Sequence, residues 1–347
     1  MGVTLKDVAK AAGVAVSTAS YVINGTGLNK VGKETQQRIL SEAAKLGYTP
    51  NIAGRVLNGG RSGTVGIIMQ MSFPWVYNDV PRLICMLLRK AGYQVTFGVA
   101  DTQAERLAVL RDMSGRSVEG VILFNCSGEM DEWYGKLPMP MVIFDGMEGE
   151  IRMALEEGSR IAARHLLEHG HRHVGCFTSL KATNIAKIAG YRRELGGAGI
   201  AWREAWEVEA FGDHGWAAKT LGAIREEGLT AFVCNNDNYA AKLMRVLLDA
   251  GIRVPEDVAL IGFDGDSFGP CLAVPLTTVV QPVNLLARRM AALMLEKIGK
   301  QDFLKRPPET LEPYLHIERS CGCSRGGGGQ SSLAFTCCSI DDEHFEK

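Results

Sequence analysis

Residues 3–14, with the sequence VTLKDVAKAAGV, decide the fold of the first part of the chain. Thr4 is a residue type that caps helix N-termini, and Asp7 follows three residues later, where a capping box places its acid. Leu5 and Val8 begin an apolar series at helical spacing. Gly13 then suits a tight turn or a C-cap. The stretch therefore predicts a short helix that begins after Thr4 and ends before Gly13.

Two more helices are predicted behind this stretch. The second extends from Ser17 to Asn24, and the third from near Lys33 to Leu46, where Gly47 ends it. Two short helices joined by a glycine-containing turn and backed by a third are typical of a helix-turn-helix. Any small three-helix bundle is the alternative. The pattern alone leaves both possibilities open.

The net charge of −1 for the whole chain hides an uneven distribution. Residues 1–62 contain eight lysines and arginines against three acids, a net charge of +5, so the remaining 285 residues carry −6. A small basic region on a mildly acidic body favours contact between that region and a polyanion.

A candidate linker follows the helical region. Pro50 biases Thr49 away from helix. Residues 51–58 can form a helix, and the glycine-rich residues 59–63 end it. A segment this short does not hold a helix alone in water, so we expect a hinge at residues 50–63.

From Thr64 onward, apolar runs alternate with helical patterns. Such near-continuous apolar runs are typical of parallel strands that are covered on both faces. The alternation predicts two doubly wound α/β lobes. The predicted strands are Val65–Met69, Val95–Ala100, Gly120–Phe124, Met141–Asp145, Val174–Thr178, Ala231–Asn235 and Val258–Asp264.

Several classes of protein are disfavoured by the sequence. Neither a dinucleotide-binding G-x-G-x-x-G after the first strand nor a P-loop is present, and no G-x-S-x-G elbow occurs, so we expect neither an enzyme nor a cofactor. No apolar run is long enough to span a membrane, and no export leader opens the sequence. The nine cysteines, an odd number mostly isolated in apolar runs, indicate reduced thiols and a cytoplasmic protein.

The sequence resembles the lactose-repressor (LacI/GalR) family over roughly residues 3–323. The resemblance implies a small all-α helix-turn-helix head (1–49), a hinge (50–63) and a two-lobed α/β periplasmic-binding-protein-like body with parallel sheets (64–323). Residues 324–347 are expected to form a disordered tail. The matching motifs are Val3–Val14, Ser17–Asn24, Leu46–Asn51, Val65–Ile68, Gly120–Leu123, His165–Arg172, Asn236–Asp237, Val254–Val258, Ile261–Asp264 and Leu276–Val279.

The resemblance implies a homodimeric repressor that binds a pseudo-palindromic double-stranded DNA operator and is nucleoid-associated when bound. Its second helix enters the major groove, and the base-reading positions match Val16, Ser17 and Tyr21. Relatives usually have a polar residue at position 21, so the operator sequence does not follow by analogy. In the hinge, Arg55 and Leu57 match the minor-groove residues, with Leu57 as an apolar wedge. The candidates for phosphate contacts are Thr18, Asn24, Asn29 and Lys30.

The resemblance also implies a carbohydrate-like effector between the lobes. Ligands of open α/β sheets lie beyond the carboxyl ends of the strands, where carboxylates accept hydroxyl hydrogen bonds. Lys187 stands where relatives have an arginine, and Ala154-Leu155 replaces their acid-asparagine pair. These departures keep open a vestigial or non-sugar cleft. The candidate effector residues are Phe73, Trp75, Asp145, Lys187, Asn236, Asp237 and Asp264, with Trp216 as another aromatic candidate.

No metal site is expected from the spacing of histidines and cysteines. The series His169-x-His171-x-His173 would suit a strand but is predicted at the end of a helix. Cys321-Gly322-Cys323 and Cys337-Cys338 could in principle bind a metal or form a disulfide, but their spacing fits no standard zinc site.

Overall fold

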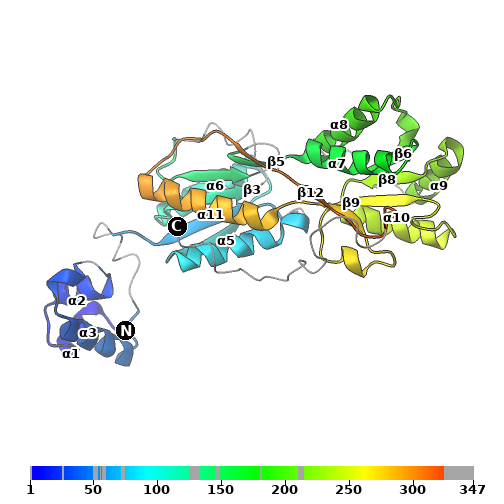
Figure 1. The fold of residues 1–347 in the computed structure, drawn as a ribbon. Coiled ribbons are helices and arrows are strands. Elements are labelled where there is room, and N and C mark those ends of the chain that lie inside the picture. Colours follow the sequence, from blue (N-terminus) through cyan, green and yellow to red (C-terminus); the bar gives the residue numbers. More distant parts are fainter. Residues whose placement is uncertain are drawn as a thin grey trace.

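The computed structural model describes residues 2–25, 27–49, 54, 56, 60–71, 75–124, 133, 135–144, 149–179, 182–209 and 215–323. A helical head at the N-terminus lies apart from an elongated body of two α/β lobes (Figure 1). No helix in these ranges is both long enough and apolar enough to cross a membrane.

The head contains the three predicted helices. They are α1 (Leu5–Ala11), α2 (Val16–Ile23) and α3 (Lys33–Lys45), with the short 3-10 helix η1 (Leu28–Lys30) before α3. The predicted capping box is formed, because Thr4 N donates to Asp7 Oδ2 at 2.8 Å and Asp7 N donates to Thr4 Oγ1. A small apolar core at the centre holds the helices together, and its members include Val8, Ala19 and Ile39.

The first lobe is a four-stranded parallel sheet in the order β2-β1-β3-β4. Gly66 and Gly98 let α6 lie close to one face, because a Cβ atom at either position would collide with α6 side chains. On the other face, α5 and α11 pack together. The strands are β1 (Thr64–Met69), β2 (Gln94–Val99), β3 (Gly120–Phe124) and β4 (Met141–Phe144), and the helices are η2 (Trp75–Tyr77), α5 (Asp79–Lys90), α6 (Gln103–Gly115) and α11 (Val283–Lys300).

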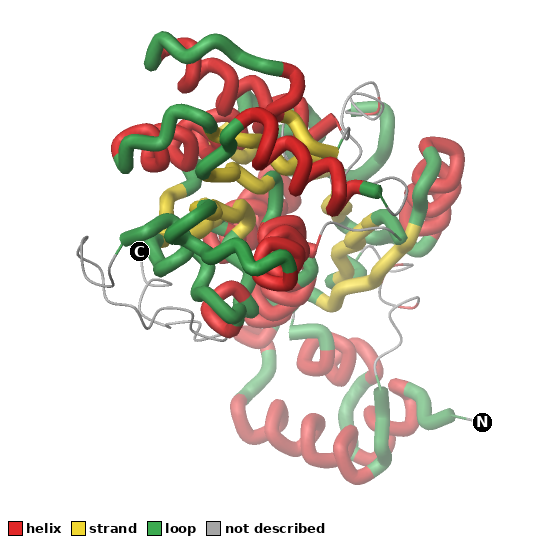
Figure 2. Tube along the Cα trace, turned by 90° about the vertical axis from the view of Figure 1, so that its right-hand side faces the viewer, coloured by secondary structure: helices red, strands yellow, loops and turns green. Residues whose placement is uncertain are grey.

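The second lobe is a six-stranded sheet in the order β12-β10-β9-β8-β6-β7, parallel except for the pairing of β10 with β12. Helices α7 and α8 lie on one face and α10 on the other (Figure 1), and Figure 2 shows helices flanking the strands of both lobes. The strands are β6 (Val174–Thr178), β7 (Glu207–Glu209), β8 (Ala231–Cys234), β9 (Ala259–Asp264), β10 (Thr277–Val280) and β12 (Tyr314–His316), and the helices are α7 (Leu155–Glu168), α8 (Ala182–Gly197), η4 (Glu204–Trp206), α9 (Trp216–Glu227), α10 (Asp237–Asp249) and η5 (Gly269–Cys271).

Three connections join the lobes: from β4 to α7, from β10 to α11, and from α11 to β12. Two of them pair side by side as the short parallel strands β5 (Ile151–Met153) and β11 (Glu309–Leu311). A buried ion pair of 2.6 Å between Lys297 Nζ and Glu150 Oε1 fixes this junction. Lys297 Nζ also donates to the carbonyl oxygens of Met141 and Leu304. Because both charges are fully buried, removing either one alone would be costly.

The predicted strands occur within one or two residues of their expected bounds, and those at Gly120–Phe124 and Val174–Thr178 match at both ends. The short strands β5, β7, β10, β11 and β12 were not predicted. The expected tail at 324–347 and most of the expected hinge, with Arg55 and Leu57, lie outside the described residues.

Candidate functional sites in the head and between the lobes

Helix α2 presents three expected base-reading residues to solvent. Val16 and Tyr21 are each 42% exposed, and Ser17 is exposed as well. Ala19 and Val22, on the opposite side of the same helix, are buried in the head. The exposed side is therefore not needed to hold the head together, and it leaves an apolar, hydroxyl-bearing surface on the second helix of a helix-turn-helix.

The expected phosphate-contacting residues border this surface. Asn29 and Lys30 are exposed on η1, and the Lys30 ammonium lies 5.8 Å from the centre of the Tyr21 ring. Thr18 is half-buried on α2. Asn24 is also half-buried, and its side-chain amide donates to Ser20 Oγ at 3.1 Å. A cationic side chain thus lies beside Tyr21, one of the residues expected to read bases.

The second lobe brings Lys187 and Asp264 together. Lys187 extends from α8, and Asp264 is the last residue of β9. Lys187 Nζ lies 3.5 Å from Asp264 Oδ1, donates to the Asn235 carbonyl oxygen at 2.6 Å and lies 3.7 Å from the centre of the Phe263 ring. Their side chains are only 7% and 10% exposed, so little water screens the interaction.

Burial and charge act in opposite directions on this pair. Burial lowers the pKa of the Lys187 ammonium, and the nearby Asp264 charge opposes that shift. Burial also raises the pKa of the Asp264 carboxyl, against the influence of Lys187 and of a hydrogen bond from Gln281. Each ion therefore depends on the other for its charge.

The backbone at Asp264 is strained. Its φ of 116° lies in a region that L-residues other than glycine rarely adopt. Residues held in such conformations cost about 1–3 kcal/mol and concentrate at functional sites. The strain at Asp264 is thus of the kind that is concentrated at functional sites.

Two residues that were not predicted from the sequence extend the site across the lobes. Gln281 Nε2 donates to Asp264 Oδ1 at 2.7 Å, and the Tyr77 hydroxyl of the first lobe donates to Gln281 Oε1 at 2.7 Å. Gln281 directly follows β10, so the rule that indicated Asp264 would also have indicated Gln281, had the strand been recognised. Tyr77 has no such signal in the sequence, and its contact with Gln281 is known only from the arrangement of the two lobes.

Asn236 and Asp237 serve the protein itself. Asn236 is the N-cap of α10, where its Oδ1 accepts from Tyr239 N at 2.7 Å. Asp237 is fully buried, and its two oxygens accept from the Thr278 hydroxyl and from Asp266 N, both at 2.6 Å. Each Asp237 oxygen therefore has a partner within the protein, and its expected contact with an effector stays a prediction.

Asp266 adds a further carboxyl close to the pair. Burial, and then the charge of Asp264, raise the pKa of this carboxyl to about 7. Its Oδ2 atom is buried and has no hydrogen-bond partner among the described residues. The site therefore has an acceptor that a ligand donor could satisfy.

Three other expected effector residues lie wholly or partly outside the described residues. Phe73 and Asp145 lie outside the described residues, and Trp75 is described only as part of η2. The alternative aromatic residue, Trp216, packs with its ring centre 5.3 Å from that of Phe177.

Two family models match the chain. "Bacterial regulatory proteins, lacI family" matches residues 4–51, and "Periplasmic binding protein-like domain" matches residues 163–321. Among curated proteins, the "HTH-type transcriptional repressor PurR" of Vibrio atlanticus is 31% identical over 91% of this chain and 98% of its own length. The protein of the same name from Photobacterium profundum is 30% identical over the same shares.

Solved structures agree on the fold. A lac repressor dimer bound to operator and the anti-inducer ONPF is 22% identical with a TM-score of 0.78, over 92% of this chain and 99% of that one. A complex of the transcriptional regulator CelR with cellobiose is 25% identical with a TM-score of 0.64, over the same shares. The expected architecture, a helix-turn-helix head on a two-lobed periplasmic-binding-protein-like body, is confirmed.

Proposed function

The chain belongs to the lacI family of bacterial regulatory proteins, and from that premise we propose that a small carbohydrate-like effector, bound at Lys187 and Asp264 between the lobes, controls the operator affinity of this DNA-binding repressor. The observation that carries the proposal is the hydrogen-bonded series Lys187–Asp264–Gln281–Tyr77, which begins in the second lobe and ends in the first.

The chemistry of the site suits a ligand rich in hydroxyl groups. An ionised Asp264 accepts hydrogen bonds and the Lys187 ammonium donates them, which matches the dual donor and acceptor character of sugar hydroxyls. The Asp266 Oδ2 atom, which has no partner among the described residues, offers another acceptor. A lysine is a point charge rather than a rigid fork, so Lys187 orients a ligand less strictly than the family's usual arginine would.

Control of DNA binding follows from the position of the series. A ligand that forms hydrogen bonds with Asp264 or Gln281 competes with the contact that joins Tyr77 to the second lobe. The ligand then favours a different arrangement of the lobes, provided that it binds the two arrangements with unequal affinity. The head and hinge precede β1 of the first lobe, so movement of that lobe changes the spacing of two heads in a dimer.

We also propose that the functional unit is a homodimer that reads a pseudo-palindromic operator through Val16, Ser17 and Tyr21. The edge strand β2 leaves Phe97 and Val99 on one strand face, 52% and 50% exposed. An exposed apolar edge of this kind invites burial against another surface, and a second copy would supply it.

The decisive experiment is a thermal-shift screen against sugars, sugar acids, polyols, sugar phosphates and nucleobases, followed by operator titrations with each hit. A ligand that binds only the folded chain raises its melting temperature by mass action. The proposal expects a sugar-class hit that changes operator affinity and is lost in Asp264→Asn. A hit from the nucleobases alone would contradict the carbohydrate class, and no hit in any class would favour a vestigial cleft.

A further inference from the structure

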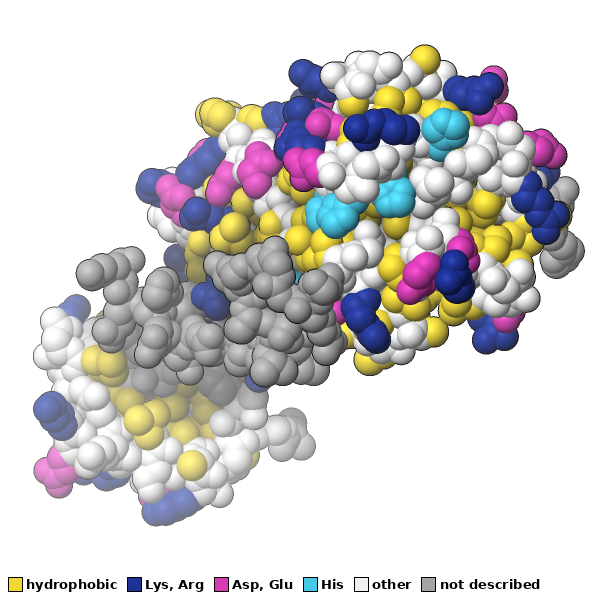
Figure 3. Space-filling model, turned by 45° about the vertical axis from the view of Figure 1, so that its right-hand side comes forward, with side chains coloured by type: hydrophobic (Ala, Val, Ile, Leu, Met, Phe, Trp, Pro, Cys, Tyr) yellow, Lys and Arg dark blue, Asp and Glu magenta, His cyan; other side chains and the backbone are white. Residues whose placement is uncertain are grey.

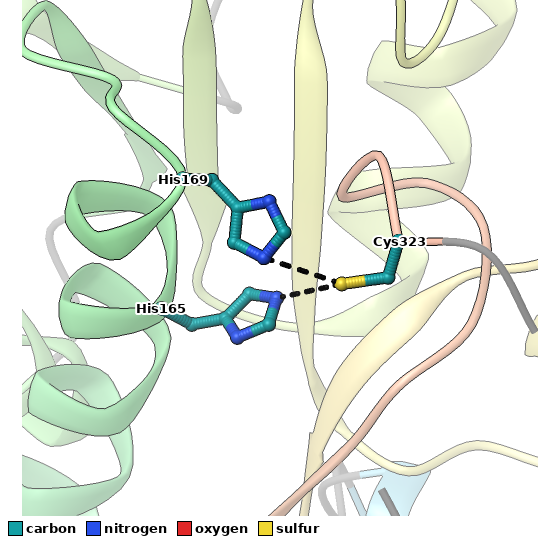
Figure 4. A group of neighbouring side chains, drawn as sticks. All are labelled: His165, His169 and Cys323. Atoms are coloured by element: carbon teal, nitrogen blue, oxygen red, sulfur yellow. Dashed lines mark hydrogen bonds between the residues drawn. The ribbon is translucent and has the colours of Figure 1, made fainter. Parts of the chain in front are cut away.

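Two histidines and two cysteines converge at the end of α7, far from the Lys187–Asp264 site. His169 Nε2 lies 3.3 Å from Cys323 Sγ, and His165 Nε2 lies 3.5 Å from the same sulfur (Figure 4). His165 Nε2 is also 3.3 Å from Cys321 Sγ. The ligand atoms of His165, His169 and Cys323 all lie within 4.8 Å of one another.

Local structure explains why these side chains meet. His165 and His169 are four residues apart at the end of α7, so they share one face of the helix, and their ring centres are 4.5 Å apart. The cysteine segment is held by the buried Ser320, whose hydroxyl donates to the Leu260 carbonyl oxygen at 2.6 Å. Ser320 Oγ also accepts from Thr277 N at 2.9 Å. The cysteines are therefore presented by a fixed backbone.

The nitrogen–sulfur distances in the group of His165, His169 and Cys323 match a tetrahedral metal site. Zinc binds cysteine sulfur at about 2.3 Å and histidine nitrogen at about 2.0–2.1 Å, which places nitrogen and sulfur ligands about 3.5 Å apart in a tetrahedron. From Cys323 Sγ, the distances to the His165 and His169 nitrogens are 3.5 and 3.3 Å. Hard cations such as Ca²⁺ and Mg²⁺ take oxygen ligands, so an N/S set of this kind selects against them.

We propose that His165, His169 and Cys323 bind one Zn²⁺ ion, with Cys321 lying beside the site. On binding, the Cys323 thiol gives its proton to solvent and coordinates as a thiolate. The proposal departs from the expectation of no metal site, because the fold brings together residues more than 150 positions apart in the sequence.

The position of the site indicates what the ion would do. Cys321 accepts a hydrogen bond from the hydroxyl of Thr277, the first residue of β10, whereas Asp264 and Gln281 lie at the carboxyl ends of the strands. The metal site thus lies near the amino end of β10, and the proposed effector site lies at the carboxyl ends of the strands of the same sheet. A bound ion would tie the segment after β12 to α7 and stabilise the second lobe without touching the effector.

The site is open enough to be loaded from solution. Cys321 is buried, His165 and Cys323 are half-buried, and His169 is exposed. Figure 3 shows histidine side chains close together on one face of the body. The exposed His169 also offers a ligand whose replacement should leave the fold intact.

The test uses the full chain, kept reduced with a phosphine and stripped of metal by a chelator. Co²⁺ is titrated first, because a thiolate–cobalt charge-transfer band and tetrahedral d–d bands report sulfur ligation directly. We expect one Co²⁺ per chain, its displacement by Zn²⁺, and a melting temperature that rises with Zn²⁺. Replacing a residue that only supports a metal ligand already weakens metal binding by about tenfold or more. Replacing a ligand itself, in His169→Gln or Cys323→Ser, should therefore weaken Zn²⁺ binding by at least about tenfold.

Two matched controls separate this site from other thiols. Cys271→Ser removes an exposed cysteine on η5, and the double variant Cys337→Ser/Cys338→Ser removes thiols at the C-terminal end of the sequence. Both should bind Co²⁺ like the wild type. Binding without a charge-transfer band, or binding unchanged in both His169→Gln and Cys323→Ser, would overturn the proposal. Circular dichroism without metal shows whether Cys323→Ser still folds, and His169→Gln decides the question if it does not.

Discussion

The Tyr77 hydroxyl of the first lobe donates a buried hydrogen bond of 2.7 Å to Gln281 Oε1, at the point where the chain leaves β10 of the second lobe. Gln281 in turn donates to Asp264. The lobes are therefore connected by a polar contact that passes through a side chain of the proposed effector site. Any ligand that engages Asp264 acts on this contact.

Replacing Tyr77 with phenylalanine should destabilise the body by about 1–3 kcal/mol, because the buried Gln281 oxygen loses its donor. The ring remains, so its edge-to-face contact with Phe144, with ring centres 5.0 Å apart, is preserved. Urea denaturation measures the loss. Tyr314→Phe, at an exposed tyrosine, is the control and should change nothing. Equal stability of Tyr77→Phe and wild type would show that the contact contributes little.

The strain at Asp264 predicts an unusual order of stabilities. Asp264→Gly and Asp264→Ala both remove the carboxylate, but only glycine relaxes a φ of 116°. Asp264→Gly should therefore be more stable than Asp264→Ala by about 1–2 kcal/mol. Both variants should lose the response to the effector while keeping operator affinity in its absence. The comparison needs thermal or urea unfolding and operator titrations, and an alanine variant as stable as the glycine variant would argue against strain.

Asp266 predicts a pH dependence of stability with a definite sign. The folded-state pKa of its carboxyl is raised to about 7, above the usual value of 3.8. The folded protein therefore holds the Asp266 proton more strongly than the unfolded chain does. The stabilisation from this proton is fully present below about pH 4 and is lost as the pH rises through about 7. Asp266→Asn should remove this part of the slope and stabilise the protein at about pH 8, by at most about 4 kcal/mol.

The measurement for Asp266 is the free energy of unfolding at a series of pH values. Asp237 and Asp264 also have raised pKa values, so some slope should persist in the variant. A slope in Asp266→Asn identical to that of the wild type would mean that Asp266 is not the group that titrates near neutrality.

Much of the fold follows from local sequence signals. The strands at Gly120–Phe124 and Val174–Thr178 are continuous apolar runs between turn signals, and both were predicted with their observed bounds. Strands β5 and β11 have three residues each and exist because they pair with one another across more than 150 positions. No local pattern indicates such a pairing.

The candidate site shows the same division between residues with a local sequence signal and residues brought together only by the fold. Asp264 and Lys187 were predicted because one ends an apolar strand and the other stands in a family motif. Gln281 and Tyr77 were not predicted, since their hydrogen bond depends on the placement of the two lobes. Asp237 was expected to contact the effector because it follows a strand end, whereas its hydrogen bonds from Thr278 and Asp266 depend on the fold and have no local signal.

The hinge expectation is tested by Leu57→Ala. An apolar wedge acts only in DNA that is kinked at the specific site, so this substitution should weaken specific binding much more than non-specific binding. Operator and random-sequence titrations at one salt concentration provide the comparison. Equal losses on both DNAs would remove Leu57 from the minor groove.

The neighbouring side chains Tyr21 and Lys30 should divide recognition between them. Lys30→Ala should weaken binding to every sequence and reduce the salt dependence by about one phosphate contact, because the ammonium neutralises the backbone. Tyr21→Ala should leave the salt dependence unchanged and lower the preference for the operator by about 1–3 kcal/mol, since Tyr21 is exposed on the surface expected to read bases.

Titrations over a range of salt concentrations separate the two effects. Lys45→Ala is the matched charge control, because Lys45 is a lysine of α3 that is paired with Glu42. A Tyr21→Ala variant that loses operator and random DNA equally would show that Tyr21 positions Lys30, 5.8 Å away, rather than reading bases.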